Sequence, residues 1–96
     1  MFSSLILIAA ARIIDARPAE ASSLALTHCQ AQAGKPLLSS KMSNEEIVRA
    51  IMAACRAEQK AYDAELRKIK FGEKLIAQGH AEWHDDLLKA VAAHRR

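Results

Sequence analysis

The sequence predicts an all-α fold: a small helical hairpin with a long central helix and a third, C-terminal helix, stapled by one disulfide bond. Composition is the first reason, because 51% of the 96 residues are hydrophobic but only 4% are aromatic. Alanine and leucine dominate the apolar residues, whereas strands favour β-branched and aromatic side chains. A helix-capping motif and two cysteines on apolar helix faces are the other reasons. A chain of this length forms one domain at most, with a marginal core.

The N-terminal segment has the pattern of a secretory signal peptide. An apolar run over residues 5–11 is followed by the small-x-small triplet at residues 19–21, which is typical of a signal-peptidase site. Two features depart from the pattern: no lysine or arginine precedes the run, and Arg12 and Asp15 interrupt the stretch before the triplet. We predict a signal peptide over residues 1–21, cleaved after Ala21, and a single helical domain over residues 22–96.

The alternative for this segment is an amphipathic helix that stays in the mature protein. Its apolar side would carry Leu5, Ile6, Ile8 and Ile13. A membrane span needs about 20 mainly apolar residues, and Arg12 cuts the run short. We therefore expect no stable membrane span once the signal is removed.

The first helix of the mature chain is expected over residues 23–33. Leu26, Cys29 and Ala33 recur there at steps of three and four, the spacing of one helix face. Gly34 and Pro36 follow. A glycine in the left-handed conformation, with a proline soon after it, is a common way to end a helix.

A capping box marks the start of the central helix. Ser43 and Glu46 are three residues apart, so the serine hydroxyl and the glutamate carboxylate can each accept a backbone N–H near the other. Met42 and Ile47 hold the positions of a hydrophobic staple, and Glu45 adds negative charge to the first turn. We predict that the helix begins at residue 44.

From that start, one apolar stripe continues to Ile69 and predicts a helix that reaches at least residue 71, roughly 42 Å long. Gly72 either bends this helix or lets it continue through residues 73–78 to Gly79. The stripe consists of Ile47, Ile51, Cys55, Tyr62, Leu66 and Ile69, widened by Val48 and Met52. A third helix over residues 80–94, with Trp83, Leu87, Leu88 and Val91, is expected to cover it; a second copy of the chain is the alternative. Tyr62 and Trp83 are assigned to core packing.

Cys29 and Cys55 lie on the apolar stripes of the first and central helices, with 25 residues between them. This spacing is too open for a CxxC redox motif, and two ligands alone make a poor zinc site. In an exported protein, an even pair of cysteines indicates a disulfide. We predict a Cys29–Cys55 bond; in a reducing compartment both would be buried thiols.

His80 and His84 are the one hint of metal chemistry, because helix residues four apart can chelate a transition metal. They do not form the zincin motif, in which glutamate directly follows the first histidine; here Glu82 comes two positions later. We interpret both as ordinary helix histidines and expect no metal and no cofactor.

Basic residues cluster near the end of the central helix, at Arg67, Lys68, Lys70 and Lys74. Acidic residues interleave with them at Glu65 and Glu73, and the whole chain carries only +3, from 14 basic and 11 acidic residues. A polyanion-binding protein usually concentrates far more positive charge on one face. We therefore expect a solvated helix face and no nucleic acid.

Motifs of catalysis, such as a phosphate-binding glycine loop or a nucleophile elbow, are missing from the sequence. The function we expect is a non-catalytic binding or structural role in the periplasm or outside the cell, with an unknown protein partner or self-association. One alternative is a cytoplasmic basic helical protein that binds nucleic acid. Another is a peripheral membrane protein that uses the N-terminal apolar segment.

Overall fold

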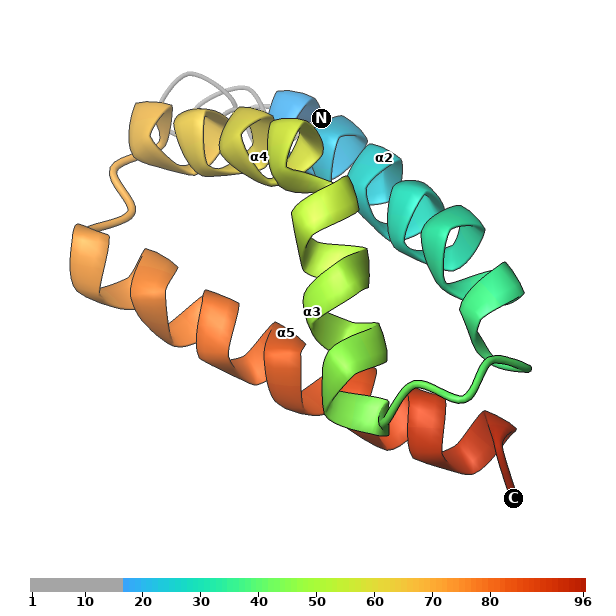
Figure 1. The fold of residues 1–96 in the computed structure, drawn as a ribbon. Helices are drawn as coiled ribbons and strands as arrows, with labels where there is room; N and C mark the ends of the chain where they lie inside the picture. The colour runs from blue at the N-terminus through green and yellow to red at the C-terminus, as the bar shows by residue number, and fades with distance from the viewer. Residues whose placement is uncertain (1–16) are drawn as a thin grey trace, which may run out of the picture.

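The computed structural model describes residues 17–96, and four α-helices and a short 3₁₀ helix account for most of this part of the chain (Figure 1). They are α2 (Arg17–Gly34), η1 (Lys35–Leu37), α3 (Asn44–Ala54), α4 (Arg56–Lys68) and α5 (Glu73–His94). No strand occurs within these residues. The predicted all-α class is confirmed. The predicted signal peptide lies outside the described residues, except for residues 17–21.

Helix α2 begins at Arg17, six residues before the predicted start. Its first turn takes part in packing, because Ala19 is only 5% exposed and lies in one apolar cluster with Leu66 and Ile76. The expected cleavage point after Ala21 thus falls within this helix. A mature chain beginning at Ser22 would lack the contact that Ala19 makes.

Gly34 ends α2 by a different device from the one expected. Its backbone is right-handed (φ −79°, ψ −32°), and the chain continues directly into η1. A Cβ at this position would lie 2.8 Å from Cδ1 of Ile51, closer than nonbonded carbons pack. The glycine therefore serves the close approach of α2 to α3, and the prediction of a left-handed cap was wrong.

The capping box at the start of α3 is confirmed. The Glu46 backbone N–H donates to the Ser43 hydroxyl oxygen at 3.1 Å, and the Ser43 backbone N–H donates to Oε1 of Glu46 at 3.1 Å. The backbone hydrogen bond lowers the pKa of the Glu46 carboxyl. Met42 packs on the cluster that contains Ile47, as the staple positions predicted.

The predicted continuous helix from 44 to 71 is wrong, because the chain breaks at Cys55 (φ −105°, ψ 23°) into α3 and α4. The two helices leave this point in different directions (Figure 1). Ile51 and its neighbours on α3 pack with Val91, near the end of α5, whereas Leu66 of α4 packs with Ala19, near the start of α2, and with Ile76, near the start of α5. The break at Cys55 thus divides the stripe between two separate apolar clusters.

The turn after α4 also differs from the expected path. Lys70 adopts a left-handed conformation (φ 71°), and the Phe71 N–H donates to the Leu66 carbonyl at 3.0 Å. Gly72 is extended (φ −74°, ψ 157°) and stands at the N-cap of α5. Residues 73–79 therefore open the C-terminal helix, which begins seven residues before the predicted start at residue 80.

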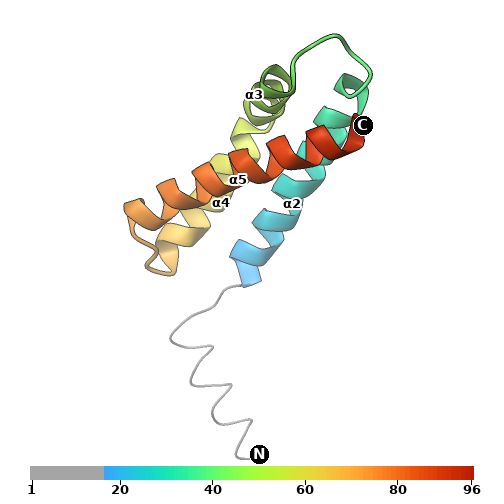
Figure 2. The same cartoon turned by 90° about the horizontal axis from the view of Figure 1, so that it is seen from below.

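Two apolar clusters hold the helices together. The first contains the buried side chains Ile47, Val48, Ile51 and Val91, and the second contains Ala19, Leu66 and Ile76. Helix α2 packs along both α3 and α4, whereas α5 packs mainly on α3. Seen from below, α5 crosses in front of α2 and α4 (Figure 2). Arg95 anchors the end of α5, because its guanidinium donates to the carbonyl oxygens of Ser40 and Met42 at 2.8 and 2.7 Å.

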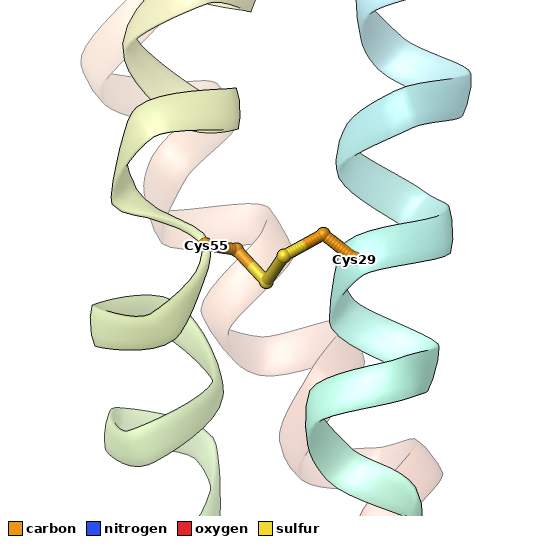
Figure 3. The surroundings of a disulfide bond; sticks show 2 residues. All are labelled: Cys29 and Cys55. Carbon is orange, nitrogen blue, oxygen red and sulfur yellow. A yellow bond between two sulfur atoms is a disulfide. The ribbon is translucent and has the colours of Figure 1, made fainter.

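The Cys29–Cys55 disulfide is present and joins the middle of α2 to the break between α3 and α4 (Figure 3). The two Cα atoms are 5.9 Å apart, within the usual range for a disulfide. Cys55 is only 1% exposed. The predicted pairing and the predicted docking of the first helix on the second are both confirmed.

Candidate binding pocket between α4 and α5

A pocket of about 220 Å³ lies between α4 and α5, which are joined by the turn at residues 69–72. Tyr62, Phe71 and Trp83 line it, and they are all the aromatic residues of the described part of the chain. The rings of Tyr62 and Trp83 are 5.2 Å apart between centroids, tilted by 33°. Both are half-buried. Tyr62 packs on the cluster of Ala19, Leu66 and Ile76, as predicted, and both rings also form walls of this pocket.

Asp63 forms the polar floor of the pocket and is only 7% exposed. Gln59, one helical turn earlier, donates from Nε2 to Oδ1 of Asp63 at 3.0 Å. Nε2 of His80 on α5 lies 2.9 Å from both carboxylate oxygens. An ionised carboxylate only accepts, so His80 donates from Nε2. These bonds offset the cost of burying the charge and also tie α4 to α5.

The charges around this pocket are of one sign. Besides Asp63, the lining includes the carboxylates of Glu82 and Asp86, and none of the described residues that line the pocket is a lysine or arginine. The chain as a whole is basic, with a formal charge of +3. Exposed Phe71 and Leu75 add apolar surface to the lining. The pocket is therefore an acidic, aromatic hollow in a basic protein.

His80 and His84 share a face of α5 but are held by different carboxylates. His80 bonds Asp63 of α4, whereas Nε2 of His84 lies 2.7 Å from Oε1 of Glu45 on α3. The hydrogen bond to Glu45, followed by the one to Asp85, raises the pKa of the His84 imidazole. Within residues 17–96, no group of three or more histidine, cysteine or acidic side chains is placed to hold a metal ion. The geometry of the pair is that of two interhelical bridges.

Two of the four residues in the basic cluster at the α4–α5 turn are paired with acidic neighbours. Arg67 donates from Nε and Nη2 to the two carboxylate oxygens of Glu73 at 2.6 and 3.1 Å. This pair raises the pKa of Arg67 and lowers that of Glu73. Nζ of Lys68 lies 3.1 Å from Oε1 of Glu65. The remaining two candidates, Lys70 and Lys74, are exposed on the turn and on the first turn of α5.

The sequence did not predict the pocket, or that Asp63 and Gln59 would line it. The four-residue spacing of Gln59 and Asp63 is a local signal for a helix-surface hydrogen bond. No local sequence pattern indicated that His80, 17 residues away from Asp63, would form a hydrogen bond with its carboxylate.

Fold and site together define a small, disulfide-stapled all-α protein with one acidic, aromatic pocket. Comparison of the chain with protein-family models, with curated proteins and with solved structures finds no match.

Proposed function

We propose that this protein is a small exported binding protein, not an enzyme, and that the pocket between α4 and α5 binds a small organic cation with a methylated ammonium group. One observation carries the proposal: three aromatic side chains and three carboxylates surround a single pocket that no lysine or arginine of the described chain lines. Aromatic faces attract cations through the ring quadrupole, and aromatic cages are the usual receptors for quaternary ammonium groups.

The size and the hydrogen bonding of the pocket favour this ligand. Its volume of about 220 Å³ is below the roughly 300–1,000 Å³ of most small-molecule sites, so the ligand is small. Both oxygens of Asp63 are already occupied by Gln59 and His80. A methylated ammonium has few or no N–H donors and needs little beyond negative potential and aromatic contact. Glu82 and Asp86 supply that potential from the lining.

A binding role is supported over catalysis by the same lining. The pair of Asp63 and His80 resembles an acid–base dyad, but none of the described residues that line the pocket is a serine, threonine or cysteine. Nucleophilic catalysis of the Ser–His or Cys–His kind needs such a group within reach of the histidine. The dyad acts here as a structural bridge between helices.

Export is supported by the disulfide, since such bonds persist mainly in oxidising compartments. None of the helices in residues 17–96 is long and apolar enough to cross a membrane. The disulfide favours a mature protein in the periplasm or outside the cell. The intact mass of protein from its native host tests this, because it reports both cleavage after Ala21 and the two hydrogens lost to the disulfide. A chain beginning at Met1 in the cytoplasmic fraction would contradict it.

Trp83 is the single tryptophan of the chain, so its fluorescence reports directly on the pocket. We expect a saturable change on titration with choline, at constant ionic strength, with a Kd near the millimolar range, or about 4 kcal/mol. Sodium chloride and the neutral isostere 3,3-dimethylbutan-1-ol are the ligand controls. An equal response to the neutral isostere would show that the pocket does not recognise charge.

Matched variants distinguish binding in the pocket from a general effect of the protein's charge on choline. Asp86→Asn removes a lining carboxylate, whereas Asp85→Asn makes the same change at the neighbouring residue, which lies outside the lining. We expect the first to weaken choline binding about threefold and the second to leave it almost unchanged. Tyr62→Leu removes one aromatic wall and should weaken binding further. Equal effects of the two aspartate variants would count against the proposal.

A further inference from the structure

A second hollow, of about 550 Å³, lies between α2, η1, α3 and α5 and has the opposite character. We call it the apolar groove. Buried Ile51 and Val91 line it together with half-buried Leu38 and Leu87. Helices α2 and α5 each pack on α3 but are not among the closely packed helix pairs themselves, so the space between them is left to the groove.

The titratable side chains that line the apolar groove are basic. Lys35 and His94 line it, and none of the described residues in its lining is acidic. Lys35 begins η1, and His94 ends α5. Figure 1 shows the C-terminal ends of α2 and α5 on the same side of the molecule. Lys35 and His94 therefore lie toward one end of a mainly apolar channel, whose other polar lining residues are Thr27 and Gln30.

We infer that the apolar groove binds one anionic single-chain amphiphile, a free long-chain fatty acid, with its acyl chain along Ile51 and Val91 and its carboxylate beside Lys35. The volume of the groove lies in the usual range of about 300–1,000 Å³ for ligand sites. Apolar walls with a few polar groups at one place are the usual design of such sites. A carboxylate fits the Lys35 ammonium, whereas an organic cation fits only the acidic pocket on the other side of α3.

Dodecanoate, titrated below its critical micelle concentration and followed by calorimetry, is the direct probe. We expect saturable one-to-one binding that tightens about fourfold for each methylene added from decanoate onwards. Dodecylamine, which has the same chain and the opposite charge, should bind at least tenfold more weakly. Equal binding of dodecylamine, no saturable binding of dodecanoate, or association only with anionic phospholipid vesicles would overturn the inference.

Two matched pairs of variants locate the binding. Ala90→Phe fills the groove, whereas Ala93→Phe makes the same change at another exposed alanine of α5 that lies outside the lining; we expect at least a tenfold loss only from the first. Lys35→Glu reverses the charge at the end of the groove, and Lys89→Glu reverses an exposed charge outside it. The first should weaken dodecanoate binding about three- to tenfold.

Unfolding curves of all four variants confirm that each is folded before its binding is measured. Equal losses within either pair would overturn the assignment of the groove. The response of Trp83 to choline should persist in Ala90→Phe, so failure of the groove and failure of the acidic pocket are distinguishable.

Discussion

Replacing Cys29 and Cys55 together by alanine is expected to lower the free energy of unfolding by about 3.5 kcal/mol. The bond closes a loop with a sequence separation of 26, and the chain-entropy model gives roughly 12 cal/mol/K for a loop of that size, or about 3.5 kcal/mol at 25 °C. Alanine is the appropriate replacement because Cys55 is buried, and a serine hydroxyl would be left without a partner there.

Urea unfolding, followed by circular dichroism at the helix band, measures the effect in the oxidised protein, the reduced protein and the double-alanine variant. Reductant should lower the stability of the wild-type protein toward that of the variant, and should not change the variant. Hydrogen exchange should speed up more in α2 than in α5, because α2 carries Cys29 whereas α5 is anchored separately by Arg95. Two reactive thiols in the untreated protein, or an unfolding curve that reductant does not change, would refute the stabilising role of the disulfide.

Three further predictions concern single side chains. Ser43→Ala removes the hydroxyl that accepts the Glu46 N–H and should cost about 1 kcal/mol in urea unfolding; an unchanged midpoint would mean that the cap is not needed. Lys70→Gly relieves the left-handed backbone at φ 71° and should stabilise the protein by about 0.5–1 kcal/mol, whereas a loss of stability would contradict the assigned conformation. The hydrogen bond to Glu45 raises the pKa of His84. The stability that this contact gives to the folded protein is therefore fully present below about pH 6.5, the pKa of an unperturbed histidine. It is lost as the pH rises through the higher pKa that His84 has in the folded protein. An NMR titration of the His84 ring checks this, with the pH dependence of stability in His84→Gln as control, and a ring pKa at or below the reference would be inconsistent with it.

Helix α3 separates the two proposed sites and links them to the disulfide. The acidic pocket lies between α4 and α5, and the apolar groove lies between α2, α3 and α5. The break at Cys55 sets the direction of α3 relative to α4. Loss of the disulfide should therefore weaken ligand binding in the groove, whose walls include α2, more than in the pocket, whose walls do not.

Features that depend on neighbouring residues were predictable from the sequence alone. The cap of α3 needs only Ser43 and Glu46, three positions apart, and the structure shows both of its hydrogen bonds. The all-α class follows from composition and helical periodicity. The disulfide follows from Cys29 and Cys55 being the two cysteines of the chain and lying on apolar faces. In each case the signal and its partner are close in the chain, or no competing partner exists.

Tertiary structure alone decided where the central helix breaks and what the histidines contact. No glycine or proline marks residue 55; the break divides the stripe between one apolar cluster that contains Ile51 and another that contains Leu66. The acidic pocket likewise depends on α5 turning back so that His80 meets Asp63. Local periodicity indicates which side chains are apolar, but not which distant segments will cover them. That choice is made by packing between segments far apart in the sequence, and both proposed sites lie where such segments meet.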